Sequence, residues 1–320
     1  MLFSALLILG LFTTQAVVAP TAPTAAATKV VAGNDVVADL VRAIAGQDVE
    51  LFVLGQGADP HHYEPTPADA KKIESADLVI EFGLGLDRAM GKLHRSTGSK
   101  AKLLVVAEGL AKKGSDAAVT DHADHADHAD HADHDHNHDH GSSAVDPHIW
   151  HDPSQVRILN ERICAALVAA RPTSAESFRS RSVELDTQLV KLDEWIKAQV
   201  LLIPESKRLL VTTHDGLQSF GNRYGFRVVG IEMTSDGADV APSQLIKMVN
   251  ALRETKSAVV FGDAAHHSRI AATVAREANV RLIETLRLDS LLQPPAVEQG
   301  KAYLETMRLN VNTIVKALQD

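Results

Sequence analysis

The chain has 320 residues, 45% of them hydrophobic and 23% charged, which is typical of a soluble globular protein with two lobes of ordinary domain size. The segment from Asp121 to His140 holds seven aspartates and no Lys or Arg, so removing it from the formal net charge of −9 leaves only −2. Without a basic stripe or a polybasic run, the composition excludes proteins that bind nucleic acid or anionic lipid through a charged surface.

The chain opens with an apolar run of about a dozen residues, followed by small residues with candidate cleavage sites near Ala19 and Ala27. We interpret residues 1–27 as a secretory signal peptide. A retained membrane anchor is the alternative, but the run is shorter than the roughly 20 residues that a membrane span needs. Cys164 is the only cysteine, so none follows the signal that could carry a lipid. The sequence therefore predicts a free periplasmic protein with no stable membrane insertion after signal removal.

Strands and helices alternate through the first half of the chain. Short apolar runs predict strands at 29–33, 49–55, 77–83 and 102–109. Amphipathic stretches between them predict helices at 35–46, 66–76 and 86–95. Thr66 is suited to cap the second of these helices, with Pro67 in its first turn. This rhythm is typical of a parallel sheet covered by helices.

The second half repeats the rhythm after two consecutive helices. The first helix runs from Pro153 to the residue before Pro172, and a long amphipathic helix follows over 173–203. Further strands are predicted at 208–213, 227–232, 258–263 and 281–285, and a last helix at 297–318. We interpret the long helix as a rigid linker between the lobes.

The expected fold class is α/β, with two lobes that each contain a mostly parallel sheet of about four strands covered by helices. The proposed boundaries are 1–27 for the signal peptide, 28–171 for the N-terminal lobe with a flexible loop at 112–145, 172–203 for the linker helix and 204–320 for the C-terminal lobe. Ligands of such folds bind at the carboxyl ends of the strands, which places the site in the cleft between the lobes.

Four side chains that can bind a metal follow predicted strands, two in each lobe. His61 comes after the second strand, His148 after the fourth, His214 at the end of the first strand of the second lobe, and Asp289 after the last strand. Three imidazoles and one carboxylate form a natural tetrahedral set for Zn²⁺. Any one of these histidines alone is more simply a surface or core residue, but the repeated Asp-Pro-His before His61 and His148 favours a shared site.

Four separated blocks of the sequence carry a resemblance to a known family. They read "GADPHHYEPTPADAKKIESADLVIEFGLGLD", "DPHIWHDP", "TTHDGLQSFGNRYGF" and "LDSLLQPPAVEQGKAYLETMRLNVNTIVKAL". They resemble the metal-specific (cluster A-I) solute-binding proteins of ABC transporters, most closely the zinc-uptake branch. The resemblance runs from about Lys29 to the C-terminus.

The resemblance implies the same four ligands, because the family's metal-binding positions match His61, His148, His214 and Asp289. Manganese-type members tend to hold a carboxylate at the third position, so His214 favours Zn²⁺ over the harder Mn²⁺. The resemblance also implies an ABC transporter permease in the inner membrane as the partner, with a metallochaperone as a further candidate partner.

Other residues are candidates for supporting or secondary roles. His151 is either an additional nitrogen near the site or a histidine at its rim. The family often has Phe-x-Glu where this sequence has Phe-Gly-Asp, ending at Asp263. Asp263 is therefore a candidate to orient a metal-binding residue without itself binding the ion. His266 and His267 form either a weak secondary site or an ordinary polar helix start.

The segment at 121–140 is a low-complexity repeat of Asp, His and Ala. It has no apolar residue larger than alanine, so it is expected to stay mobile, and it ends eight residues before His148. We interpret it as an arm that collects metal weakly near the cleft, the alternative being an inert spacer. The candidate secondary ligands are His122, His125, His128, His131, His134, His136, His138 and His140.

The sequence thus predicts a monomeric zinc-binding protein that delivers Zn²⁺ to a permease and catalyses no reaction. The alternatives are a periplasmic zinc buffer or chaperone, and a binder of manganese or another divalent metal in the same family. A zinc hydrolase is disfavoured because the sequence lacks H-E-x-x-H and Asp289 fills the position that a catalytic zinc keeps open. Affinity is expected to fall below about pH 6.5, because coordinating imidazoles must be neutral.

Overall fold

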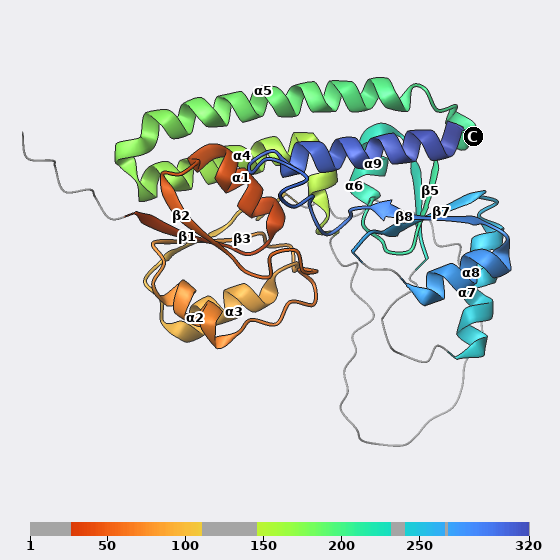
Figure 1. Ribbon diagram of the computed structural model, residues 1–320, viewed down its shortest axis with the longest axis horizontal. Helices are drawn as coiled ribbons and strands as arrows, with labels where there is room; N and C mark the ends of the chain where they lie inside the picture. Colours follow the sequence, from red (N-terminus) through yellow and green to blue (C-terminus); the bar gives the residue numbers. More distant parts are fainter. Residues whose placement is uncertain (1–26, 111–145, 232–240, 266–267, 320) are drawn as a thin grey trace, which may run out of the picture.

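The computed structural model describes residues 27–110, 146–231, 241–265 and 268–319 (Figure 1). Residues 1–26 of the predicted signal peptide and the whole predicted loop at 112–145 lie outside the described residues. His266 and His267 lie outside them as well. No helix in the part of the chain that the structure describes is long and apolar enough to span a membrane.

The first lobe is built on a parallel sheet in the order β2-β1-β3-β4. Its elements are β1 (Thr28–Ala32), α1 (Asp35–Ala45), β2 (Val49–Val53), α2 (Pro67–Glu74), β3 (Leu78–Glu81), α3 (Arg88–Thr97) and β4 (Lys102–Val105). Local sequence sets the helix starts. Asn34 accepts a hydrogen bond from the Val37 amide at the start of α1, and Thr66 and Asp69 form a reciprocal capping box at the start of α2.

The second lobe repeats this arrangement with a parallel sheet in the order β6-β5-β7-β8. Its elements are β5 (Leu209–Thr212), α6 (Gln218–Tyr224), β6 (Arg227–Gly230), α7 (Pro242–Glu254), β7 (Val259–Asp263), α8 (Arg269–Ala278), β8 (Arg281–Leu286) and α9 (Ala302–Gln319). Two parallel four-stranded sheets, each covered by helices, confirm the predicted fold class.

Two long helices lie between the two sheets in the chain. A short 3₁₀ turn (Ile149–His151) leads into α4 (Pro153–Ala170), and α5 (Ala175–Val200) then extends along both lobes (Figure 1). The inner face of α5 buries Leu185, Leu189, Leu192 and Ile196 at 4% exposure or less. These side chains belong to one apolar core that continues from Val30 in the first sheet to Phe261 in the second. Burial of this stripe favours a fixed arrangement of the lobes along α5.

The last helix differs from its prediction at the N-terminal end. The expected start was residue 297, whereas α9 begins at Ala302 and Gly300 has a φ of +80°, which favours glycine. The carboxylate of Asp39 in α1 accepts hydrogen bonds of 2.9 Å from the amides of Gly300 and Tyr303. A distant side chain therefore caps this helix, and local periodicity could not reveal it.

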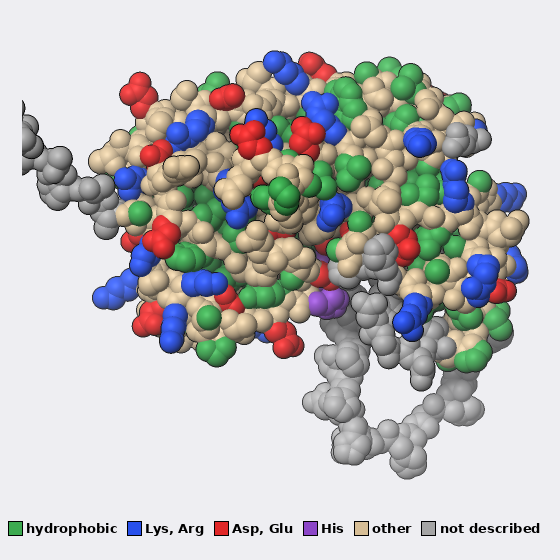
Figure 2. Space-filling view, viewed as in Figure 1, with side chains coloured by type: hydrophobic (Ala, Val, Ile, Leu, Met, Phe, Trp, Pro, Cys, Tyr) green, Lys and Arg blue, Asp and Glu red, His purple; other side chains and the backbone are tan. Residues whose placement is uncertain are grey.

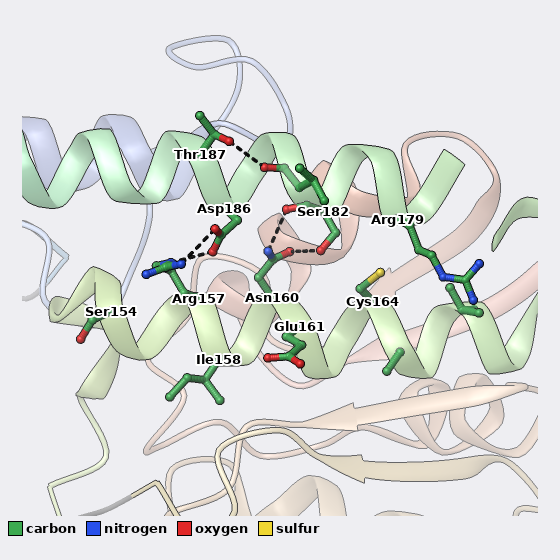
Figure 3. A pocket seen from close by; sticks show the side chains of 13 residues that line it. Ser154, Arg157, Ile158, Asn160, Glu161, Cys164, Arg179, Ser182, Asp186 and Thr187 are labelled. Carbon is green, nitrogen blue, oxygen red and sulfur yellow. Dashed lines mark hydrogen bonds and ion pairs between the residues drawn. The ribbon is translucent and has the colours of Figure 1, made fainter. Parts of the chain in front are cut away.

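A groove of about 870 Å³ lies between α4 and α5 (Figure 3). Arg157 and Asp186 form an ion pair of 2.6 Å across it, and Asn160 bonds to the Ser182 carbonyl. Its described lining contains no histidine and includes none of the predicted ligands. The groove is therefore not the site at which the predicted ligands bind a metal ion.

Candidate metal centre

The structure brings the four predicted ligands into one cluster between the lobes. His61 lies in the loop after β2, His148 precedes the 3₁₀ turn, His214 follows β5 and Asp289 follows β8. One candidate ligand atom from each residue lies within 4.8 Å of the others. Histidine and acidic side chains are visible together at the hollow between the lobes (Figure 2). The carboxyl ends of the two sheets thus face a common centre, as expected for parallel sheets.

The Nε2 atom of His148 is the centre of this cluster. It lies 3.1 Å from Nε2 of His61, 3.1 Å from Nε2 of His214 and 3.0 Å from Oδ1 of Asp289. The outer distances are 3.7 Å from His61 Nε2 to Asp289 Oδ1 and 3.4 Å from His214 Nε2 to Asp289 Oδ2. One N–H on this nitrogen could serve only one of the three acceptors well, so a shared cation satisfies the group better than hydrogen bonds do.

These separations fit a tetrahedral ion. Two ligand atoms about 2.0–2.1 Å from a tetrahedral zinc ion lie about 3.3–3.4 Å apart. The observed distances of 3.0–3.7 Å bracket this value. The Asp289 carboxylate is buried, with Oδ1 toward His148 and His61 and Oδ2 toward His214. The donor set and its spacing suit a divalent metal ion.

The cluster is open on one side. The side chains of His148 and Asp289 are 3% and 5% exposed, whereas those of His61 and His214 are 25% and 37% exposed. His148 and Asp289 therefore form the base of the site, and His61 and His214 stand at its mouth. This arrangement gives an ion a path to the site from solvent.

Asp146 orients the central histidine. Its Oδ1 lies 2.8 Å from Nδ1 of His148 and accepts the His148 backbone amide at 2.9 Å, while its Oδ2 accepts from Ser219 Oγ at 3.2 Å. A proton on Nδ1 directs the lone pair of Nε2 toward the metal position, as in other carboxylate–histidine–metal arrangements. Sequence reasoning missed this role, although the Asp-x-His spacing within "DPHIWHDP" was a usable signal.

The charges of the cluster shift the pKa values of its members. Burial by itself lowers the pKa of His148, but the carboxylates of Asp146 and Asp289 outweigh it and raise the value to about 9. Burial opposes ionisation of Asp289, yet the imidazoles of His148 and His61 bring its pKa well below the usual value. Burial lowers the pKa of His214. The metal-free protein therefore carries a proton on His148 at neutral pH.

Asp263 supports the segment that presents Asp289. It ends β7 and is buried, and its Oδ2 accepts the backbone amide of Leu288, the residue before Asp289. Its other oxygen accepts the amide of Ala265. The structure thus places Asp263 behind a predicted ligand, and its predicted supporting role remains a proposal.

His151 lies outside the four-residue cluster. It is 2% exposed, and its Nε2 lies 3.0 Å from the carbonyl oxygen of Leu288, which also accepts from Trp150 Nε1 at 3.1 Å. Burial lowers its pKa to about 4, so the ring is neutral at physiological pH and donates to that carbonyl. The geometry favours a role in holding the Asp289 segment over a role as a fifth ligand.

We expect His151→Ala to retain the tight metal site while lowering the free energy of unfolding by about 1–3 kcal/mol, because a buried hydrogen bond is lost. Zinc titration and denaturant unfolding of the same variant check both parts. Loss of the tight site with unchanged unfolding would indicate instead that His151 coordinates the ion.

His62, the sequence neighbour of His61, is not part of the four-residue cluster. His62 is 87% exposed and lies 3.8 Å from Asp59. The eight histidines of the Asp/His segment, from His122 to His140, lie outside the described residues, as do His266 and His267. Their metal binding stays a prediction.

Comparison with known proteins gives a family match over most of the chain. The family described as "Zinc-uptake complex component A periplasmic" matches residues 30–317. The manganese-binding lipoprotein MntA of Bacillus subtilis is 30% identical over 297 residues, covering 91% of this chain and 90% of the relative. The manganese ABC transporter substrate-binding lipoprotein PsaA of Streptococcus anginosus is 28% identical over 291 residues, covering 91% and 89%.

Solved structures show the same fold. The periplasmic zinc-binding protein TroA from Treponema pallidum superposes with a TM-score of 0.74 at 24% identity, covering 91% of this chain and 99% of that one. An Mn-bound periplasmic metal-binding protein from Candidatus Liberibacter asiaticus gives a TM-score of 0.72 at 24% identity with the same coverage. At this identity the likeness is one of fold.

The names of the relatives contradict one prediction. MntA and PsaA are both named lipoproteins. The prediction of a free periplasmic protein without a lipid anchor is therefore wrong. The prediction rested on a single feature, the lack of a cysteine after the apolar N-terminal run. Cys164, the one cysteine of the sequence, lies buried in α4.

Proposed function

Because the chain belongs to the zinc-uptake complex component A family, whose members are metal-binding substrate-binding proteins of ABC transporters, we propose that it captures Zn²⁺ between its lobes and delivers it to a membrane permease. Proteins of this family serve transport rather than catalysis. The ion is therefore cargo that must be bound and released, and His61, His148, His214 and Asp289 are the proposed ligands.

The donor set is the observation that carries the proposal. Three imidazole nitrogens and one carboxylate surround one point at separations that suit a tetrahedral ion. Mn²⁺ is a harder ion that prefers oxygen ligands and more of them, whereas Zn²⁺ accepts a nitrogen-rich set of four. This chemistry supports zinc as the cargo.

Manganese is the second candidate, and the relatives favour it. MntA of Bacillus subtilis and PsaA of Streptococcus anginosus are both named for manganese. Asp289 has two carboxylate oxygens near the cluster, so a fifth, oxygen ligand is available to an ion that needs more than four. Because most nitrogen and oxygen sites bind Zn²⁺ more tightly than Mn²⁺, the uptake of each ion by cells, rather than relative affinity, decides between these candidates.

His214 is the residue at which selectivity can be tested. We expect the unaltered chain to bind Zn²⁺ about 100-fold or more tightly than Mn²⁺, in line with the Irving–Williams order. The variant His214→Glu exchanges a nitrogen for a carboxylate at the open side of the site, so it should lower zinc affinity and reduce that ratio at least about tenfold. Competitive titration of both ions into both proteins measures the ratio.

A matched control for this test is His62→Glu, which adds the same charge at an exposed position beside the site. It should leave the ratio unchanged, because it adds a carboxylate without replacing any proposed ligand. A His214→Glu protein with the zinc-to-manganese ratio of the unaltered chain would contradict the assignment of His214 as a ligand.

Uptake separates a transport protein from a zinc buffer. Cells that lack the chain should lose uptake of radioactive zinc at low external zinc and keep uptake of manganese. Restoration by the unaltered chain, but not by a His148→Ala chain, would tie uptake to the cluster. Normal zinc uptake without the chain would favour a buffer or chaperone, and loss of manganese uptake would favour the manganese binder.

A further inference from the structure

Two loops that carry proposed ligands both contact the buried carboxylate of Asp35, which lies outside the cluster. Asp35, the first residue of α1, is 6% exposed. Its Oδ2 accepts a hydrogen bond of 3.1 Å from the Gly57 amide and one of 2.8 Å from Gln293 Nε2. Gly57 precedes His61 by four residues, and Gln293 follows Asp289 by four. One oxygen atom therefore touches both the first-lobe loop of His61 and the second-lobe segment of Asp289.

Both polar atoms of the Gln293 side-chain amide make hydrogen bonds. Its Nε2 donates to Asp35 and, at 3.3 Å, to the Leu291 carbonyl, while its Oε1 accepts from Gln56 Nε2 at 3.3 Å. Both partners in the first lobe, Asp35 and Gln56, are thus bound by one side chain of the second. These contacts can exist only when the two ligand-bearing segments are at this separation.

Hydrogen bonds within each segment connect the contact at Asp35 to the ligand that the segment carries. In the His61 loop, the Ala58 amide bonds the Gly55 carbonyl at 2.8 Å and the His61 amide bonds Asp59 Oδ1 at 2.8 Å. In the other segment, the Leu292 amide donates to Thr306 Oγ1 at 2.9 Å and the Leu288 amide to Asp263. A change of position at Gly57 or Gln293 therefore moves His61 or Asp289.

We propose that Asp35 and Gln293 are positioning residues that hold the His61 loop and the Asp289 segment at the separation required by the bound ion. The inference rests on the proposed function, because it gives these residues a role in retaining the cargo. Breaking the contact removes hydrogen bonds that hold the two segments at this separation, so release of the ion is accelerated more than its binding.

The test is the rate at which Zn²⁺ leaves the full-length protein after mixing with an excess of a chelator. Gln293→Ala and Asp35→Ala should each speed release about tenfold, as expected for the loss of one or two hydrogen bonds. Because the Asp35–Gln293 hydrogen bond is lost in both variants, the double variant should release zinc more slowly than the product of the two single effects predicts. Asp35→Asn keeps an amide oxygen as acceptor for both donors and should release zinc at nearly the original rate.

Asp39→Ala is the matched control. Asp39 lies one helical turn from Asp35, and its hydrogen bonds go to Gly300 and Tyr303 at the start of α9 rather than to a ligand-bearing loop. It should lower the melting temperature of the metal-free protein and leave zinc release unchanged. Gln293 is only partly buried, so Gln293→Ala provides a variant that folds even if Asp35→Ala does not.

Two results would overturn the inference: zinc release from Gln293→Ala within twofold of the unaltered chain, or equal acceleration by Asp35→Asn and Asp35→Ala. A His148→Ala measurement separates this failure from failure of the proposed site. If His148→Ala still releases zinc slowly, the assignment of the ligands is wrong. If His148→Ala loses slow release and Gln293→Ala does not change it, only the positioning role is wrong.

Discussion

Replacing His148 with alanine is expected to abolish high-affinity zinc binding. The Nε2 atom of His148 lies 3.0–3.1 Å from one atom of each other proposed ligand, so its loss removes the centre of the set. Loss of a residue that only supports a ligand typically costs 10–100-fold in affinity, and loss of this ligand should exceed about 100-fold. Competition with a chromophoric chelator at fixed pH measures the change.

The control for this prediction is His62→Ala. His62 neighbours a proposed ligand in sequence, but its side chain is 87% exposed and points to Asp59. Its removal should leave zinc affinity within about twofold, because it takes away no ligand. Similar losses in the two variants would mean that the histidines act through overall charge rather than through coordination.

Zinc affinity is expected to rise steeply with pH up to about 9. The carboxylates of Asp146 and Asp289 raise the pKa of His148 to about 9 against the effect of burial, so the metal-free protein holds a proton there at neutral pH. A coordinating imidazole must be neutral, and zinc therefore competes with this proton. Below the pKa, affinity should fall about tenfold for each pH unit, or about 100-fold from pH 8.5 to 6.5.

His214 adds nothing to this slope above pH 6.5, because burial lowers its pKa below the ordinary value of 6.5. Ordinary histidines would make zinc affinity depend on pH only below about 6.5. The raised pKa of His148 makes zinc affinity depend on pH up to about 9. Calorimetry in buffers of different ionisation enthalpy should detect about one proton released per zinc bound at pH 7.5. Asp146→Asn should flatten the slope, since it removes a charge that raises the pKa of His148; an affinity that does not change between pH 6.5 and 8.5 would contradict this account.

The strands and the bounds of α1 to α5 were predictable to within about four residues, because each follows from local pattern. Apolar runs marked every strand, and Thr66 marked the start of α2 through its capping box. The start of α9 was not predictable, because Asp39 binds the amides of Gly300 and Tyr303 from a helix more than 250 residues earlier in the chain. Long-range caps leave no periodic signal.

The membership of the cluster followed from topology, whereas its finer chemistry did not. Strand ends placed His61, His148, His214 and Asp289 at one cleft because parallel strands share their carboxyl edge. The pairing of Asp146 with His148, and of His151 with the Leu288 carbonyl, depends on side-chain directions that spacing alone does not give. Sequence spacing likewise does not settle which ion fills the site, because Zn²⁺ and Mn²⁺ can share nitrogen and oxygen ligands.

The most direct test of the central claim is a zinc titration of the full chain and of a variant lacking residues 121–140, each with and without His148→Ala. The claim predicts one tight zinc site per chain that survives the deletion and disappears with His148→Ala. Additional weaker binding should disappear with the deletion, since its eight histidines supply it. Loss of the tight site on deletion, or its persistence in the His148→Ala chain, would contradict the assignment of the cluster as the metal site.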